Sequence, residues 1–125
     1  MKALVLAAAA FAASIGTAQA QDLAAGEQSF RKCLPCHAVG PEARNKIGPI
    51  LNGIDGRKTG TTEYNYTEAN KKAEIVFNEA TFKDYIQNPM QKIPGTKMAF
   101  AGIKNETEIA ALWAYLKQFK ADGSK

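Results

Sequence analysis

Several residue types and patterns are scarce in this sequence. Its 125 residues include one histidine, two cysteines and one tryptophan, and its formal net charge is only +4. That length leaves no room for a two-domain enzyme or a large barrel. The small charge excess does not indicate nucleic-acid binding, and no basic run is interleaved with aromatic residues. Beyond residue 20 no segment is apolar enough to span a membrane, and no repeat or low-complexity segment occurs.

Residues 1–20 have the pattern of a cleaved export signal. Lys2 is their only charge, residues 3–15 form a short apolar run, and Ala18-Gln19-Ala20 gives a small-residue cleavage pattern. The apolar run is shorter than the ~20 residues that span a bilayer, although an uncleaved anchor is the alternative. We therefore predict a signal peptide at residues 1–20 and a periplasmic domain at residues 21–125, without stable membrane insertion.

Both cysteines lie in the short motif Cys33-Leu34-Pro35-Cys36-His37. In an exported protein such a pair could form a disulfide or a redox-active dithiol. A histidine directly after the second cysteine is instead the attachment signature of c-type haem. Two thiols at this spacing can each bond one vinyl group of the same porphyrin, and the imidazole of His37 can then ligate the iron. A thioredoxin-like protein would need a βαβ pattern around the motif, and none is visible.

The chain after residue 20 predicts an all-α domain of short helices and long loops. Residues 38–66 are rich in Gly, Pro and Asn and have no sustained period, so we predict a loop there. Elements this short bury little surface, and a flat apolar haem would complete the core. Caps and apolar spacing place helices from Asp22 through Phe30 to about Cys33, from Thr67 to Lys72, from Asn78 through Ile86 to an end at Asn88-Pro89, and from Asn105 to a point before Gly123.

The sequence predicts a close contact at the first helix, and a cap and an apolar face for the last helix. Gly26 is unfavourable in a helix interior by ~1 kcal/mol relative to Ala, and a close contact with another helix would explain it. In the last helix, Asn105 followed by Glu108 resembles a capping box. The apolar face of that helix contains Ile109, Leu112, Trp113 and Leu116.

A second iron ligand would decide what such a haem can do. The thioether of methionine is a good axial ligand and raises the reduction potential. Of the three methionines, Met1 leaves with the signal, so Met90 and Met98 are the candidates. Pro94-Gly95 suits a tight turn that would fix a loop side chain, which favours Met98. Core packing is the commoner role of a single methionine, so the spacing alone leaves both open.

Together these motifs resemble class I cytochromes c, close to bacterial cytochromes c2 and mitochondrial cytochrome c. The resemblance runs from about Gly26 to Tyr115 and implies a small cytochrome c fold around one haem c, covalently bound through Cys33 and Cys36. It implies His37 and Met98 as the axial iron ligands. The runs that carry it are, in order, Cys33–His37, Gly48-Pro49, Gly56–Gly60, Tyr66–Asn70, Asn88-Pro89 and Ile93–Phe100.

The resemblance also implies residues around the cofactor. The carbonyl of Pro49 would accept a hydrogen bond from the non-ligating nitrogen of His37, and Tyr85 would approach the sulfur of Met98. Phe77 replaces a tryptophan of the family and has no N–H donor for a haem propionate, so we expect another donor to compensate. The residues implied around the propionates are Arg57, Tyr66, Thr67, Asn70 and Thr96, and those implied between the first and last helices are Gly26, Phe30, Leu112 and Tyr115.

By this resemblance the protein is a monomeric one-electron carrier of respiration or photosynthesis and not an enzyme, because two protein ligands leave no open site on the iron. Its implied partners are membrane redox complexes: a quinol-oxidising cytochrome complex as donor and a photosynthetic reaction centre or terminal oxidase as acceptor. The alternatives are a haem peroxidase or gas sensor with a labile sixth site, a thiol–disulfide oxidoreductase, and a subunit of a larger enzyme. The lysines expected to rim the haem edge and attract acidic docking surfaces are Lys32, Lys46, Lys92, Lys97 and Lys104.

Overall fold

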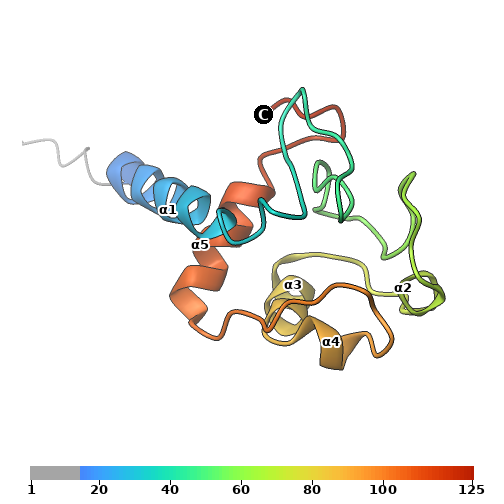
Figure 1. Cartoon of the computed structure of the whole chain (residues 1–125). Coiled ribbons are helices and arrows are strands. Elements are labelled where there is room, and N and C mark those ends of the chain that lie inside the picture. The colour runs from blue at the N-terminus through green and yellow to red at the C-terminus, as the bar shows by residue number, and fades with distance from the viewer. Residues whose placement is uncertain (1–14) are drawn as a thin grey trace, which may run out of the picture.

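The computed structural model describes residues 15–125, and Figure 1 shows short helices joined by long irregular segments. Within these residues the one pairing of extended backbone is an isolated antiparallel bridge between Lys58 and Val76. The described chain is therefore all-α, and the loop predicted over residues 38–66 is confirmed. The helices are α1 (Ile15–Phe30), α2 (Glu68–Lys72), α3 (Glu79–Ile86), α4 (Pro89–Lys92) and α5 (Glu106–Leu116).

The first helix begins earlier than its predicted cap. Residues 1–14 of the predicted signal lie outside the described residues, and α1 already begins at Ile15. The predicted helix start at Asp22 is therefore wrong for the full chain. No proline occurs in residues 15–21, and extending an existing helix is much easier than nucleating a new one, so the helix continues through Asp22.

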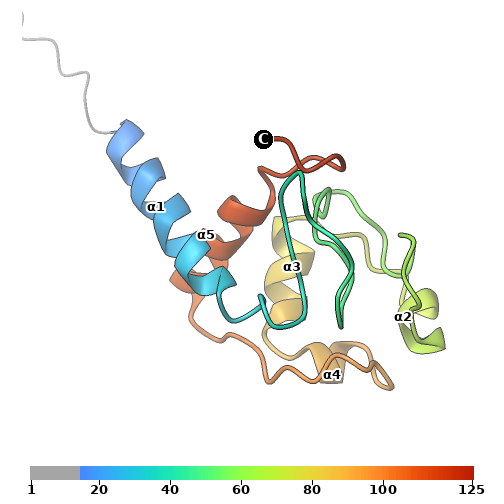
Figure 2. The same cartoon turned by 45° about the horizontal axis from the view of Figure 1, so that its top comes forward.

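The α1 and α5 helices lie side by side on the side of the molecule away from α2 (Figures 1 and 2). A Cβ atom at Gly26 would lie 2.1 Å from the backbone oxygen of Ala111 and 2.6 Å from the Cβ of Tyr115. Only glycine permits this approach, which confirms the predicted close helix contact. The rings of Phe30 on α1 and Tyr115 on α5 pack with centroids 5.6 Å apart, and Leu112 on α5 is wholly buried.

The predicted capping box of α5 forms only in half. The side chain of Asn105 accepts a hydrogen bond from the backbone N–H of Glu108, as predicted. The carboxylate of Glu108, however, accepts from the buried hydroxyl of Ser29 at 2.9 Å and from the ammonium of Lys32. These donors are stronger partners than a solvent-exposed helix end, so the carboxylate ties α5 to the end of α1. The predicted caps Thr67 and Asn78 are confirmed at α2 and α3.

The α4 helix is not among the predicted helices, although its signal is local. Proline suits the first position of a helix because its missing N–H would have no partner there, and Asn88 caps this helix by accepting from the backbone N–H of Gln91. The segment Asn88-Pro89 therefore separates α3 from a new helix. After α4 the backbone N–H of Thr96 donates to the carbonyl of Ile93 at 3.0 Å, and Gly95 takes a φ of 90° as the turn requires.

Candidate functional site

A cavity of about 430 Å³ lies between α3, α5 and the irregular segments. Much of its wall is apolar and comes from residues far apart in the sequence, such as Ile54, Phe82 and Leu112. Met90 is absent from the wall and is 47% exposed on α4. Every residue proposed from the sequence to surround the cofactor lines the cavity, namely Cys33, Cys36, His37, Pro49, Arg57, Tyr66, Thr67, Asn70, Tyr85, Thr96 and Met98.

His37 is held in the form that binds a metal. Its Nδ1 lies 2.7 Å from the carbonyl oxygen of Pro49. A carbonyl oxygen can only accept, so Nδ1 carries the proton and Nε2 keeps a free lone pair. Burial lowers the pKa of His37, against the opposing effect of its bond to Pro49, and the positive charges of Arg57 and Lys46 lower it further. The imidazole is therefore neutral at neutral pH.

Gly48 fixes the plane of the same imidazole. A Cβ at this position would lie 2.5 Å from the Cε1 of His37, so the backbone packs directly on the ring. The N–H of Gly48 also donates to the carbonyl of Cys36 at 2.7 Å. The motif Gly48-Pro49 marks this place in the sequence, but sequence reasoning gives Gly48 itself no role.

The two cysteines follow α1 in a tight turn. The backbone N–H groups of Cys36 and His37 both donate to the carbonyl of Cys33, at 3.0 and 2.8 Å. Burial raises the pKa of the Cys33 thiol to about 11, outweighing the lowering by Lys32. A redox-active dithiol needs a thiolate near neutral pH, which requires a lowered pKa. This environment argues against the thiol–disulfide oxidoreductase alternative.

The sulfur of Met98 has a defined partner. The hydroxyl of Tyr85 on α3 donates to it at 3.1 Å, and the backbone N–H of Met98 donates to the side-chain oxygen of Thr96 at 3.3 Å. Burial raises the pKa of Tyr85 to about 12, so its hydroxyl keeps its proton through the neutral range. The thioether is therefore held at the cavity wall by one side chain and one turn.

A second part of the wall is polar and has no acidic side chain. The guanidinium of Arg57 donates to the backbone carbonyl of Asn52, and desolvation lowers the pKa of Arg57. The hydroxyl of Tyr66 is hydrogen-bonded to Thr62, and neither Asp nor Glu occurs among the lining residues. A cavity with an apolar body and donors without carboxylates suits a flat apolar molecule that carries acidic groups. The residues present therefore fit a haem.

Asn52 does not line the cavity but supports Arg57, which does, and sequence reasoning missed this role. Its side-chain oxygen accepts from the backbone N–H of Gly40 at 2.8 Å, and its amide nitrogen donates to the carbonyl of Gly40 at 2.9 Å. The side chain thus fixes the segment whose carbonyl holds Arg57. No local motif marks this role, because its partner is chosen by the path of a long loop.

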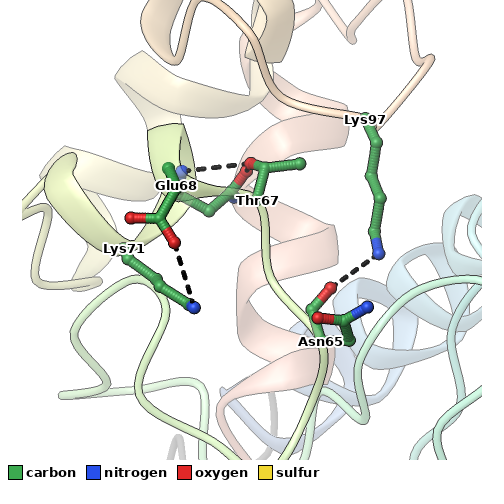
Figure 3. Close-up of polar contacts among 6 residues, drawn as sticks. Asn65, Thr67, Glu68, Lys71 and Lys97 are labelled. Carbon is green, nitrogen blue, oxygen red and sulfur yellow. Dashed lines mark hydrogen bonds and ion pairs between the residues drawn. The ribbon is translucent and has the colours of Figure 1, made fainter.

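The lysines predicted to surround the cavity mouth differ in position. Only Lys32 and Lys97 line the cavity, whereas Lys92 forms an ion pair with Asp84 at 2.8 Å. Figure 3 shows Lys97 extended toward the backbone carbonyl of Asn65, to which it donates at 2.7 Å. The same ammonium lies 4.5 Å from the ring centroid of Tyr64. Lys46 and Lys104 donate to the carbonyls of Leu34 and Gln87.

The fold and the cavity define a small helical protein with a site for a covalently attached haem. Residues 23–120 match the family model for cytochrome c. The chain is 53% identical to cytochrome c2 of Blastochloris viridis over 126 aligned residues, covering 100% of this chain and 99% of that relative. It is 61% identical to a cytochrome c2 of Rhodoplanes tepidamans over 106 residues, covering 84% of this chain and 99% of that relative.

A solved structure gives the same result. The chain resembles cytochrome cH from Methylobacterium extorquens with a TM-score of 0.72 and 38% identity, covering 78% of this chain and 98% of that structure. The chain therefore belongs to the cytochrome c family. As a member it carries one covalently bound haem c and is an electron carrier, not an enzyme. Within residues 15–125, the structure has no helix with the length and apolarity to traverse a bilayer.

Proposed function

We propose that the protein is an exported one-electron carrier in which His37 and Met98 are the axial iron ligands of haem c bound through Cys33 and Cys36. The observation that carries this proposal is the convergence of a neutral imidazole, two thiols and a hydrogen-bonded thioether on one cavity. When bound, the haem supplies one-electron chemistry between ferric and ferrous iron.

The protein side chains then have three tasks. The bond between His37 and Pro49 orients the imidazole and raises its basicity as a ligand. The hydroxyl of Tyr85 holds the sulfur of Met98 in place. The apolar wall excludes water, which keeps the surroundings similar in both oxidation states. With His37 and Met98 both bound to the iron, neither substrate nor oxygen would have a place to bind.

The signal at residues 1–20 belongs to this proposal. The match to the Rhodoplanes tepidamans relative supports it, because 106 aligned residues cover 99% of that protein and only 84% of this chain. The intact mass of the protein recovered from a periplasmic extract should correspond to a start near Gln21 plus one haem. A full-length mass would contradict the proposed cleavage.

The proposed partners are membrane redox complexes. A quinol-oxidising cytochrome complex would reduce the protein, and a photosynthetic reaction centre or a terminal oxidase would oxidise it. Lys97 at the cavity supports docking on an acidic surface, because opposite charge speeds encounter, whereas Lys32 beside it is already paired with Glu108. A contact guided by surface charge is transient, and the carrier must leave one complex to reach the next. We therefore propose that it is a monomer in solution.

The ligand assignment is tested with Met98→Ala and the matched variant Met90→Ala. Methionine 90 is exposed and away from the cavity, so its loss should leave the ferric sulfur-to-iron absorption band intact. Loss of Met98 should abolish that band and allow carbon monoxide to bind the ferrous form. The opposite pattern would overturn the assignment. Rapid carbon monoxide binding by the unsubstituted protein would instead favour the peroxidase or gas-sensor alternative.

A further inference from the structure

Thr59 lies on the cavity wall and has a buried hydroxyl whose proton has no hydrogen-bond acceptor among the described residues. Its residue is 5% exposed, and its backbone N–H donates to the carbonyl of Ile75 at 2.8 Å. Its side-chain oxygen accepts from the backbone N–H of Ile75 at 3.2 Å. Across residues 15–125, no hydrogen bond is formed in which this hydroxyl is the donor. A hydroxyl carries one donor proton, and leaving it unpaired in a buried site is unfavourable.

The pairing of two short segments turns Thr59 toward the cavity. The backbone N–H of Phe77 donates to the carbonyl of Arg57 at 2.8 Å, and Lys58 forms an antiparallel bridge with Val76. Side chains alternate between the two faces of such a pair. Val76 is 47% exposed, so Lys58 and Val76 take the outer face. Arg57, Thr59 and Phe77 share the inner face, and all three line the cavity.

The surrounding side chains do not supply an anionic acceptor. Phe77 has no polar group, and Arg57 is itself a donor. The lining has no Asp or Glu, so a carboxylate that meets the Thr59 proton must come from the bound cofactor. The titratable or charged side chains that line the cavity are Lys32, Cys33, Cys36, His37, Arg57, Tyr64, Tyr66, Tyr85 and Lys97.

We propose that Thr59 donates its hydroxyl hydrogen bond to one carboxylate of the bound haem, beside Arg57, and so keeps that carboxylate ionised. This inference rests on the proposed function for the presence of haem in the cavity. It assigns Thr59 a binding role in addition to its contact with Ile75. It also supplies a donor on the face where Phe77 has none.

The test is the dependence of the midpoint potential on pH in the haem-loaded protein. Protonation of the carboxylate produces a bend in this curve, and a hydrogen bond to the charged form lowers the pH of the bend. In Thr59→Val the bend should move up by about one pH unit, whereas Thr59→Ser should keep it in place. A bend unmoved in Thr59→Val would overturn the proposal.

Thr61→Val is the matched control. Thr61 is exposed, donates to the carbonyl of Lys58 at 2.6 Å and does not line the cavity, so its loss should leave the bend unchanged. An equal shift in Thr61→Val and Thr59→Val would mean that loop disturbance, not the hydroxyl, moves the bend, and would also overturn the proposal.

A second measurement needs no variant and applies even if Thr59→Val does not fold. In the diamagnetic ferrous protein, proton NMR should show a slowly exchanging Thr59 hydroxyl proton with an Overhauser effect to a propionate methylene group. A hydroxyl proton close only to protein carbonyls would refute the assignment. A failure of the proposed function would be seen separately, by extraction of the protein with acid acetone. Haem that the solvent removes would not be covalently attached, whatever the result for Thr59.

Discussion

Replacing Tyr85 by Phe removes one hydroxyl from the site and almost nothing else. Tyr85 is 8% exposed, and its ring packs edge-on against Phe77 with centroids 5.2 Å apart, a contact that phenylalanine can keep. The change therefore removes the donor to the sulfur of Met98 and leaves the packing in place. A hydrogen bond to the thioether withdraws electron density from it, which disfavours ferric iron more than ferrous iron. The midpoint potential of Tyr85→Phe should therefore fall.

The size of the fall follows from the strength of the bond. A neutral hydrogen bond contributes ~0.5–1.5 kcal/mol net, and sulfur is a weak acceptor, so about 0.5–1 kcal/mol is the relevant range. The potential shifts by the difference in this energy between the ferric and ferrous states, so the range sets the upper limit of the fall. A tenfold change in a one-electron equilibrium corresponds to ~59 mV, so the fall should be at most about 20–40 mV. Because burial raises the pKa of Tyr85 to about 12, the fall should be constant through the neutral range.

Equilibrium redox titration of the haem-loaded protein measures the effect. Tyr115→Phe is the matched control, since Tyr115 lies on α5 between Phe30 and Phe119 and does not line the cavity. Its potential should stay at the starting value. A potential in Tyr85→Phe that equals or exceeds the control value, while the sulfur absorption band persists, would refute the reasoning.

Three further outcomes follow from the helix contact, the carboxylate and the surface charge. Gly26→Ala should lower the free energy of unfolding by about 1–3 kcal/mol in denaturant titration, despite its ~1 kcal/mol better helix propensity; a gain in stability would contradict the close crossing. The bonds from Lys32 and Ser29 hold the pKa of Glu108 below its ordinary value, so Glu108 stabilises the fold above its unfolded pKa, and this contribution is lost as pH falls through the folded pKa. Glu108→Gln should therefore lower the free energy of unfolding by less than about 1 kcal/mol at neutral pH, because the ion pair is partly exposed. The variant should also lose less stability than the unsubstituted protein as the pH falls. An equal loss of stability in acid would count against the contact. Stopped-flow rates with an isolated acceptor complex should fall as salt rises, since charges are screened over ~8 Å at physiological salt, and a salt-independent rate would remove the docking role of the lysines.

The features that the sequence predicts well are those decided within a few residues. The residues of the motif Cys33–His37 lie in one turn, and the caps Thr67 and Asn78 act on N–H groups three residues away. The turn after Ile93 likewise depends on neighbouring residues. Such signals do not depend on the rest of the fold, and Pro89 at the first position of α4 is another signal of this kind.

Features decided by distant contacts were beyond this reasoning. The carboxylate of Glu108 had a local partner available and took Ser29 and Lys32 across the helix contact. The side chain of Asn52 forms two hydrogen bonds with the backbone of Gly40 because a long loop brings these residues together. Spacing alone likewise could not choose between the two methionines, since the exposure of a side chain depends on what packs over it.

The ring of Phe77 connects the polar wall of the cavity with the wall that contains Met98. The backbone of Phe77 is hydrogen-bonded to that of Arg57, and its side chain packs against Tyr85, which in turn bonds the sulfur of Met98. A change in volume at position 77 therefore acts on both the polar wall and the thioether. A tryptophan there would add an N–H donor, but its extra bulk would press on the ring that holds the sulfur. Phenylalanine leaves the ring of Tyr85 undisturbed. On the face that Phe77 shares with Thr59, the hydroxyl of Thr59 can then supply the hydrogen-bond donor that phenylalanine lacks.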